Sequence, residues 1–244
     1  MRLTRVFVDS PLTPDADVRL PDAAANHVGR VLRLRAGATI MAFDGSGNDY
    51  RCEILSVKGD EVSVRVGPRS SGLPESPLRI TLVQAISRGE RMDWTLQKAT
   101  ELGVRTIVPV LSARSVVRLD DSQAEKKLRH WRAIVAGACE QCGRSVVPEI
   151  RQPQELSRYL ASSAREGQRF VLSPTGPASL AGLTSVGARV ELLIGPEGGL
   201  DDAELERAAA SGYAPVRLGP RVLRTETAGI VALTVLQATW GDLV

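Results

Sequence analysis

The first 66 residues carry an alternating hydrophobic pattern that is typical of short β-strands. In 61-EVSVRV-66 a valine occupies every second position, and the turn-forming stretches 44-DGSGND-49 and 58-KGD-60 separate apolar segments. A short helix followed by a tight turn is expected at residues 22–37. The region predicts a small antiparallel sheet or barrel, with strands at residues 5–9, 38–44, 50–57 and 61–66.

From residue 79 onward the pattern changes to strands that alternate with helices. In the segment that ends at Gly103, apolar residues recur at helical spacing, at Met92, Leu96, Ala99 and Leu102. The predicted helices cover residues 91–103, 123–143, 153–164, 201–211 and 225–240. The predicted strands cover residues 79–86, 104–111, 145–150, 169–174, 190–194 and 214–219. This alternation predicts βαβ units and a mostly parallel sheet with helices on both faces.

A linker separates the two patterns. Residues 67–78, GPRSSGLPESPL, contain three prolines, two glycines and three serines without any periodicity. We therefore expect one domain at residues 1–70, a linker at 71–78 and a second domain at 79–244.

The last predicted helix, 225-TETAGIVALTVLQATW-240, is apolar around most of its circumference, at Ile230, Val231, Leu233, Val235 and Leu236. Such a helix must be buried on more than one side. We expect it to form a subunit interface, and the alternative is burial within the monomer.

Composition excludes several classes of protein. The chain of 244 residues is 43% apolar, without an apolar run of membrane-spanning length or a signal-peptide pattern at its start, so we expect a cytoplasmic protein without membrane contact. The three cysteines Cys52, Cys139 and Cys142 are too few for a disulfide framework. The Cys139-x-x-Cys142 pair lies near the end of a predicted helix without paired ligands elsewhere, so we expect packing residues and no metal site.

The positive charge of the chain is carried almost entirely by arginine, since only four of the 31 cationic residues are lysine. Arginine suits phosphate and base recognition, although a coding bias would also raise its frequency. Clusters occur at Arg30, Arg33 and Arg35, at Arg88 and Arg91, and around Arg114. They predict a nucleic-acid surface that both domains contribute to, and the alternative is a solvated surface.

The segment 190-VELLIGPEGGLDDAELERAAASG-212 predicts a strand, a glycine-rich turn and a helix. The turn 195-GPEGG-199 is not a phosphate-binding loop, because no Gly-Lys-Ser/Thr follows and no GxGxxG pattern is present. In the simplest interpretation Asp201 caps the helix, Glu204 completes a capping box, and the glycines only permit a tight turn.

Two further loops favour a binding site over a simple turn. Residues 217–228, RLGPRVLRTETA, follow a strand and lead into the last helix, and 172-LSPTG-176 follows another strand. If these strands are neighbours in a parallel sheet, their loops meet at its carboxyl edge, where open α/β sheets bind ligands. Together the three loops predict a pocket for one small molecule.

The combination of 195-GPEGGL-200 with 218-LGPRVLRTETA-228 resembles the RsmE family of SPOUT-class ribosomal RNA methyltransferases. Similar segments occur at residues 27–37, 97–116 and 131–150, so the resemblance extends over essentially the whole chain. It implies an α/β fold in which a PUA-like β-barrel precedes a SPOUT domain with a deep trefoil knot.

The resemblance also implies an activity. Family members use S-adenosyl-L-methionine to methylate N3 of a uracil in 16S rRNA of the small ribosomal subunit, at position 1498 in the usual rRNA numbering. They act as homodimers through the C-terminal knot helix, without a metal. The alternatives are a SPOUT enzyme that acts on tRNA or 23S rRNA, and a non-catalytic RNA-binding assembly factor.

The site residues follow from these loops and from the resemblance. We expect Arg221 and Arg224 to bind the uracil oxygens or a phosphate, and Glu226 or Glu197 to accept the proton. The expected cofactor-binding residues are Leu172, Gly195, Pro196, Glu197, Gly198, Gly199, Leu218, Gly219, Leu223, Thr227 and Ala228. The expected RNA-binding residues are Arg30, Arg33, Arg35, Arg88, Arg91 and Arg114.

Overall fold

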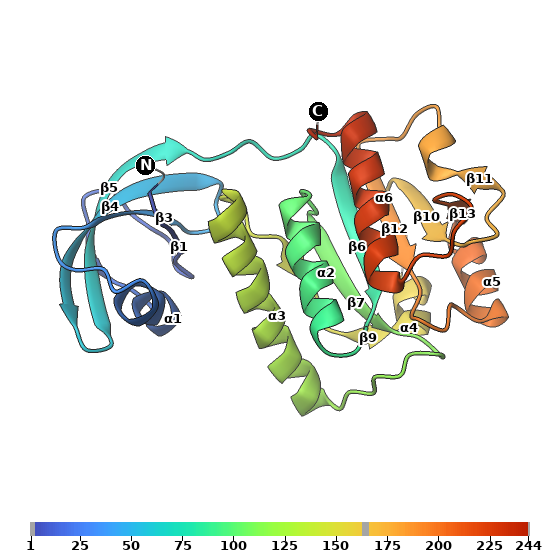
Figure 1. Cartoon of the computed structure of the whole chain (residues 1–244), viewed down its shortest axis with the longest axis horizontal. Coiled ribbons are helices and arrows are strands. Elements are labelled where there is room, and N and C mark those ends of the chain that lie inside the picture. Colours follow the sequence, from blue (N-terminus) through green and yellow to red (C-terminus); the bar gives the residue numbers. More distant parts are fainter. Residues whose placement is uncertain (1–2, 163–165, 244) are drawn as a thin grey trace. The chain divides into compact units, whose positions relative to one another are not determined.

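The computed structural model describes residues 3–162 and 166–243 (Figure 1). The chain divides into an N-terminal unit, residues 1–75 with 136–147, and an α/β unit, residues 76–135 with 148–244. The predicted helix at 153–164 ends in Ser163 and Ala164, which lie outside the described residues. Among the described residues, no helix is long and apolar enough to cross a membrane.

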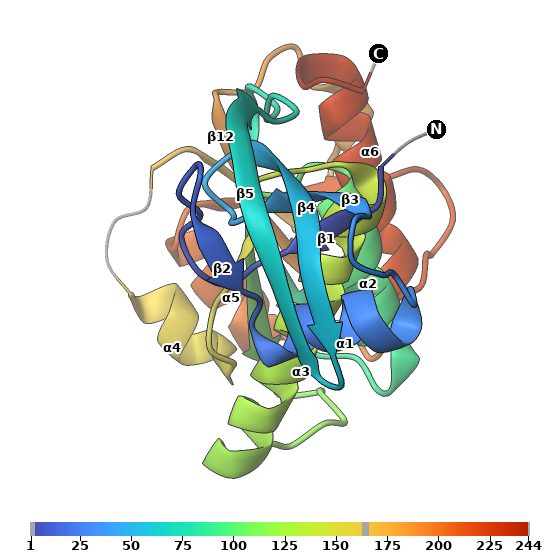
Figure 2. The ribbon, with the colours of Figure 1, turned by 90° about the vertical axis from the view of Figure 1, so that its left-hand side faces the viewer.

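The N-terminal unit is built on a five-stranded sheet in the order β1-β3-β4-β5-β2. Strand β1 pairs in parallel with β3, and the other neighbours are antiparallel, with β4 and β5 forming the long hairpin seen in Figure 2. The elements are β1 Arg5–Phe7, β2 Asp17–Arg19, α1 Asp22–Asn26, a π-helix His27–Val31, β3 Thr39–Phe43, β4 Asn48–Lys58 and β5 Glu61–Ser71. The predicted small sheet is confirmed, but β2 was missed because three residues are too few for a visible alternation.

The segment of linker-like composition, residues 67–78, is not irregular throughout, because residues 67–71 continue strand β5. Tyr50 pairs with Arg69 and Cys52 pairs with Val66, so Gly67 and Pro68 lie opposite Arg51 at a β-bulge. A Cβ atom on Gly67 would lie only 2.1 Å from the Arg51 carbonyl oxygen, which explains the glycine. Glycine and proline therefore mark a bulge here and not the end of the strand.

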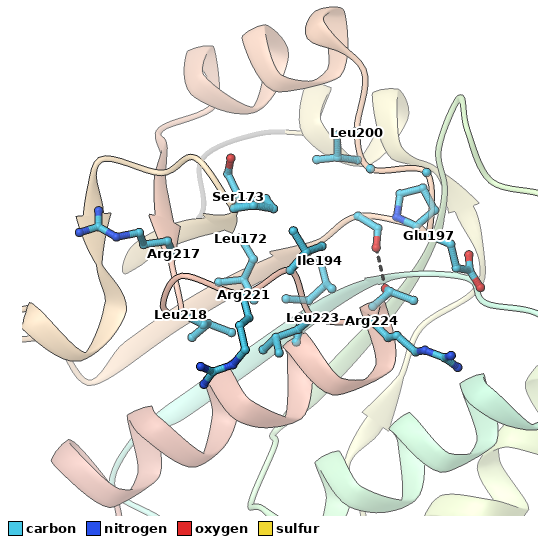
Figure 3. Close-up of a pocket in the computed structure, with 18 of the residues that line it drawn as sticks. Leu172, Ser173, Ile194, Glu197, Leu200, Arg217, Leu218, Arg221, Leu223 and Arg224 are labelled. Atoms are coloured by element: carbon cyan, nitrogen blue, oxygen red, sulfur yellow. Dashed lines mark hydrogen bonds between the residues drawn. The ribbon is translucent and has the colours of Figure 1, made fainter.

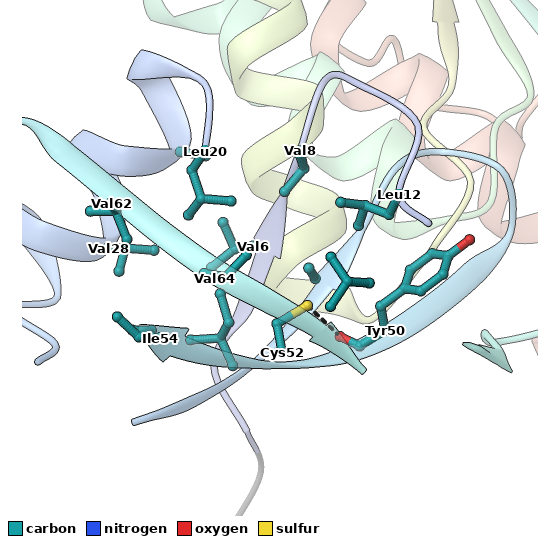
Figure 4. Packing of buried hydrophobic residues seen from close by; sticks show 14 of the residues in the cluster. Val6, Val8, Leu12, Leu20, Val28, Tyr50, Cys52, Ile54, Val62 and Val64 are labelled. Atoms are coloured by element: carbon teal, nitrogen blue, oxygen red, sulfur yellow. Dashed lines mark hydrogen bonds between the residues drawn. The ribbon is translucent and has the colours of Figure 1, made fainter. Parts of the chain in front are cut away.

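The core of the N-terminal unit comes from the inward-facing positions of its strands (Figure 4). Val62, Val64 and Val66 of β5 are fully buried, as the alternation predicted. Val28, from the π-helix, closes the end of the same core beside Ile54 and Val62.

The end of helix α3, Asp121–Cys142, belongs to the N-terminal unit, although we assigned it from the sequence to residues 79–244. Arg5 Nη1 lies 2.8 Å from Asp49 Oδ2, and Ser145 Oγ donates a 2.6 Å hydrogen bond to the other oxygen of Asp49. Arg144, which is buried, forms an ion pair with Glu75. Buried charges require partners, so this network fixes residues 136–147 to the sheet.

The α/β unit contains an eight-stranded sheet in the order β11-β13-β10-β12-β6-β7-β8, with β9 also paired to β7. All of these pairs are parallel. The elements are β6 Arg79–Ala85, α2 Glu90–Glu101, β7 Thr106–Leu111, β8 Glu149–Ile150, β9 Gln154–Glu155, α4 Leu156–Ala161, β10 Gln168–Leu172, β11 Ala178–Ser179, a 3-10 helix Leu180–Gly182, β12 Arg189–Ile194, α5 Asp202–Ala210, β13 Tyr213–Arg217 and α6 Thr225–Trp240. The predicted α/β class and parallel sheet are confirmed.

Helices cover both faces of this sheet. Helices α2 and α6 pack together on one face, where α6 contacts β6 and β12 (Figure 1). On the other face, Val83 and Ala85 of β6 join a core cluster with Leu156 of α4 and Ala208 of α5. Alternate residues of a strand point to opposite faces, so Leu82 and Gln84 are directed toward α6.

Helix α6 is buried against the sheet and α2 through Ala232, Leu233 and Leu236, while Ile230 and Val235 are only half-buried. The buried residues of α6 recur at the spacing of a single helical stripe, so the expected burial on more than one side is not reached within one chain. The expected subunit interface stays a prediction.

Candidate functional site

A cavity of about 610 Å³ lies at the carboxyl ends of β10, β12 and β13 (Figure 3). It is lined by residues from all three loops that we singled out from the sequence. Strand β10 lies between β12 and β13, so the two glycine-rich loops follow strands that are not direct neighbours. The loop that begins at Leu172 is therefore the central one, and the predicted three-loop pocket is present.

Most residues expected at the cofactor site line this cavity. They are Leu172, Gly195, Pro196, Glu197, Gly198, Gly199, Leu218, Gly219, Leu223 and Ala228. Arg221 and Arg224 line it as well. Thr227 and Glu226 do not, because they lie in the first turn of α6, whose cavity-facing residues are Thr225 and Ala228.

Some lining residues lie in the predicted pocket loops but were not among the expected cofactor-binding residues, namely Ser173, Pro174, Arg217, Val222 and Thr225. Ile194, Leu200, Leu205 and Val216 were missed altogether. Ile194 is the last residue of β12, and Val216 is next to last in β13, so their apolar character indicated core and not a binding surface. The signal that could have found them is position, because the last residues of parallel strands lie beside the loops that follow.

The cavity has an apolar centre and a charged rim. Leu172, Ile194 and Leu223 lie at its centre in Figure 3, and the guanidinium groups of Arg221 and Arg224 lie at its edge. Neither of these arginines forms an ion pair with another described residue, and both are exposed. Such a pocket suits a flat apolar ligand portion, with two free cationic groups beside it.

The GPEGG loop both caps a helix and lines the cavity. The Asp201 side chain accepts a hydrogen bond from the Glu204 backbone amide, and the Glu204 side chain accepts one from the Asp201 backbone amide. The predicted capping box is therefore confirmed. Glu204 also accepts a 2.7 Å bond from the Ala113 amide. Gly199 has φ of +70° and donates to the Pro196 carbonyl at 2.9 Å. The glycine is therefore needed for the turn, which the cap holds in place.

Two arginines hold the loops of the pocket. Arg114 Nη1 donates to the Gly198 carbonyl at 3.1 Å, and Arg217 Nη1 donates to the Gly176 carbonyl at 2.8 Å. We predicted Arg114 as an RNA-binding residue, which stays a prediction, and in the free protein its guanidinium contacts the GPEGG loop. A guanidinium with several donors is well suited to fix carbonyl groups of an irregular loop.

Arg91 was also expected to bind RNA, and it lies at the cavity between two carboxylates. Its Nη1 donates to Glu197 at 3.1 Å, and its Nε lies 3.8 Å from Glu226. The Glu226 side chain is 13% exposed, and its Oε2 is buried without a hydrogen-bond partner among the described residues. The two candidate proton acceptors thus share one cation, and Glu226 keeps a free acceptor oxygen.

The remaining predicted RNA-binding arginines are exposed and are not part of the cavity lining. Arg88 follows β6 in the α/β unit, while Arg30, Arg33 and Arg35 follow α1 in the N-terminal unit. Arg30 forms an exposed ion pair with Asp60, and Arg33 has a positive φ of 54°. These positions are accessible to a large ligand.

The Cys139-x-x-Cys142 pair has the surroundings of packing residues. Burial raises the pKa of the Cys139 thiol to about 12, against the weaker opposite effect of Arg144. Cys142 Sγ lies 4.0 Å from the Cys139 carbonyl oxygen. No group of three potential metal ligands occurs among the described residues.

Residues 74–237 match a family model described as an RNA methyltransferase domain, and residues 20–67 match one described as an RNA methyltransferase PUA domain. The chain is 34% identical to ribosomal RNA small subunit methyltransferase E of Buchnera aphidicola subsp. Schizaphis graminum, over 99% of this chain and 98% of the relative. The enzyme of that name from Bacillus subtilis is 32% identical over 86% of both chains.

Solved structures give the same assignment. The ribosomal RNA small subunit methyltransferase E of Neisseria gonorrhoeae, bound to S-adenosyl methionine, superposes with a TM-score of 0.91 at 35% identity over the full length of both chains. A Legionella pneumophila protein in complex with the cofactor SAM gives a TM-score of 0.96 at 41% identity, again over both full chains. The fold is a PUA-like domain with a SPOUT α/β trefoil-knot domain, and the chain belongs to the RsmE family of SPOUT-class ribosomal RNA methyltransferases.

Proposed function

We propose that this protein transfers a methyl group from S-adenosyl-L-methionine to N3 of a uracil in 16S rRNA, the uracil at position 1498 in the usual numbering. The observation that carries the proposal is the three-loop cavity, in which the RsmE-like segments 195–200 and 218–228 face each other. The named relatives, which are small-subunit rRNA methyltransferases, support the substrate class.

The residues of the cavity fit the cofactor. Its volume of about 610 Å³ is within the range of small-molecule sites. Leu172, Ile194 and Leu223 offer an apolar surface for an adenine ring, and the loop backbone offers polar groups to its edge. When bound, S-adenosyl-L-methionine supplies an activated methyl group on a sulfonium.

Arg221 and Arg224 are the residues that we propose for the uracil. Uracil N3 becomes nucleophilic when its proton leaves, and the negative charge then spreads to the neighbouring carbonyl oxygens. Cationic donors at the rim of the cavity stabilise that charge as it develops. Both arginines line the cavity, and neither forms an ion pair with another described residue.

Glu226 is our preferred proton acceptor. Glu197 is already engaged by the 3.1 Å hydrogen bond from Arg91, whereas Glu226 Oε2 has no partner among the described residues. Glu226 does not line the cavity, so it accepts the proton directly only if the bound uracil reaches the first turn of α6. We expect Glu226→Gln to lower kcat far more than Glu197→Gln does.

The RNA and a second copy of the chain are the proposed partners. Arg30, Arg33 and Arg35 in the PUA-like unit, with Arg88, present exposed cations for rRNA phosphates. The half-buried residues Ile230 and Val235 of α6 form the surface that we assign to a homodimer interface. The proposed location of the protein is the cytoplasm, where ribosomes are assembled.

Calorimetric titration with S-adenosyl-L-methionine tests the cofactor site. A Cβ atom on Gly195 would lie 3.1 Å from Leu200 Cγ, so Gly195→Val should distort the loop and weaken binding at least about tenfold. Gly187→Ala is the control, because a Cβ atom at Gly187 meets nothing within 4 Å. Unchanged affinity in Gly195→Val would reduce GPEGG to a turn.

A mass-spectrometric survey of modified nucleosides in a deletion strain tests the target. Loss of 3-methyluridine from 16S rRNA alone is the expected result. Loss of a methylated nucleoside from tRNA or 23S rRNA would favour a different RNA substrate. An unchanged survey, together with no binding of S-adenosyl-L-methionine, would favour an assembly factor without catalytic activity.

A further inference from the structure

Gln84 is a fully buried polar residue on β6, which pairs with β12 in the sheet. Its side chain faces α6, where a Cβ atom built on Gly229 would lie 3.2 Å from Gln84 Oε1 and 3.8 Å from Leu82. Glycine at position 229 lets the helix lie close to this point of the sheet. Gln84 does not line the cavity, so it cannot contact a ligand there.

The side chain of Gln84 begins a chain of hydrogen bonds that ends at the GPEGG loop. Gln84 Nε2 donates to Thr225 Oγ1 at 3.0 Å and to the Ala85 carbonyl at 3.1 Å. Thr225 Oγ1 donates to the Gly195 carbonyl at 2.6 Å, the bond drawn in Figure 3. The Gly195 carbonyl can only accept, so the single proton of the Thr225 hydroxyl is used in that bond. Toward Gln84 the hydroxyl can then only accept, and the Nε2 amide of Gln84 supplies the proton.

This arrangement is costly for folding. Gln84 Oε1 is buried and accepts no hydrogen bond from any described residue. A methionine of similar size would fill the same space without a buried unpaired acceptor. A polar residue that lowers the stability of the core at this position requires another explanation.

We propose that Gln84 is a positioning residue for the cofactor pocket, acting through Thr225 on Gly195. The hydrogen-bond chain joins Thr225, the first residue of α6, to Gly195, the first residue of GPEGG. The loop that precedes α6 and the GPEGG loop that follows β12 therefore keep one relative position. This inference rests on the proposed function, since it concerns the same pocket. It adds a residue outside the cavity, on a strand that contributes no residue to the lining.

The test compares cofactor affinity with the stability of the free protein. We expect Gln84→Met to raise the Kd for S-adenosyl-L-methionine about tenfold, while the thermal midpoint of the free protein stays the same or rises. A residue that served only the core would lower the midpoint and the affinity together. Thr225→Ser, which keeps the hydroxyl, should bind within about threefold of the wild type, and Thr225→Val should lose about tenfold.

The double variant Gln84→Met/Thr225→Val shows whether the two residues affect cofactor affinity through one chain of hydrogen bonds or independently of each other. Residues that act through one another give non-additive changes, so the double variant should bind like Thr225→Val alone. Multiplied losses would overturn the proposal, as would unchanged affinity in Gln84→Met.

Hydrogen exchange of the free protein tests the inference independently of the proposed function. The Gly199 amide, bonded to Pro196, and the Ala228 amide, bonded to Arg224, report on the two loops. Gln84→Met should accelerate exchange at both about tenfold and leave the β4–β5 hairpin unchanged. Unaltered exchange at both amides would refute the positioning role, whether or not the wild type binds S-adenosyl-L-methionine. A wild type that binds no S-adenosyl-L-methionine would refute the proposed function.

Discussion

Arginine has opposite surroundings in the two units of this molecule. In the N-terminal unit Arg144 is buried and the Arg5 side chain is only 9% exposed, and each is paired with a carboxylate. At the cavity of the α/β unit, Arg221 and Arg224 are exposed and have no ion-pair partner among the described residues. A buried, paired arginine fixes structure, whereas an exposed cation beside a cavity is available to a ligand.

The difference teaches that residue type alone does not indicate a role. Arg91 and Arg114 belong to the arginine clusters that we assigned to RNA, yet one is paired with Glu197 and the other holds Gly198. The surroundings of each guanidinium decide which arginines should affect activity and which should affect folding.

The largest expected effect is on catalysis, from Arg224→Ala. Removing a cation that stabilises developing charge lowers kcat/KM by about 10²- to 10³-fold in related cases, and we expect a loss at the upper end of that range. The thermal midpoint should stay near that of the wild type, because Arg224 is exposed. Arg207→Ala, an exposed arginine in the last turn of α5, is the control and should be fully active. Activity of Arg224→Ala within a few-fold of wild type would remove it from the mechanism.

The second effect is on stability, from Asp49→Asn in the N-terminal unit. Burial opposes ionisation of Asp49, but hydrogen bonds from Arg5 and Ser145 outweigh it and hold the pKa of the carboxyl below its usual 3.8. The variant leaves Arg5 without a charged partner and should lose about 3 kcal/mol at pH 7, measured by urea unfolding.

The pH dependence of that loss has a definite sign. A lowered folded-state pKa means that the stabilisation is complete above about pH 4 and disappears as pH falls through the folded-state value. The difference in the free energy of unfolding between wild type and Asp49→Asn should therefore become smaller below pH 4. A difference that is constant from pH 7 to pH 3 would show that the charge of Asp49 has no part in it.

A smaller effect is expected from the exposed arginines of the N-terminal unit. Replacing Arg30, Arg33 and Arg35 together by alanine should raise KM for the RNA about tenfold at low salt, with kcat unchanged. The increase should become smaller at higher salt, because the lost contacts are electrostatic. An equal loss at all salt concentrations would indicate damage to the fold near the π-helix.

The smallest effect is expected at the cysteines. Burial raises the pKa of Cys139 to about 12, so its thiol stays protonated and should not react with a maleimide at pH 8 in the folded protein. Mass spectrometry of labelled peptides should find Cys139 modified only after denaturation. Rapid labelling of Cys139 in the folded state would contradict its assignment as a packing residue.

Periodicity predicted most of this fold, because it records which side chains are buried. The valines of 61–66 and the helical spacing of Met92 and Leu96 are both found buried as expected. Periodicity failed where backbone geometry decides the structure, as at the bulge of Gly67 and in the short strand β2.

The site was predicted less completely, for a physical reason. The loops were visible as glycine-rich breaks after strands, and most of their residues line the cavity. Ile194 and Val216 were missed because an apolar residue that contacts a ligand looks like one that contacts the core. Gln84 was missed because a hydrogen bond to Thr225, 141 positions later, leaves no local pattern.

Methyl transfer by the purified protein tests the central claim most directly. Small ribosomal subunits and free 16S rRNA from a deletion strain would be incubated with S-adenosyl-L-methionine and analysed by mass spectrometry of nuclease fragments. The account predicts one new methyl group, as 3-methyluridine at position 1498 of 16S rRNA, which Arg224→Ala fails to produce. A methyl group on another base, or none although the cofactor binds, would contradict it.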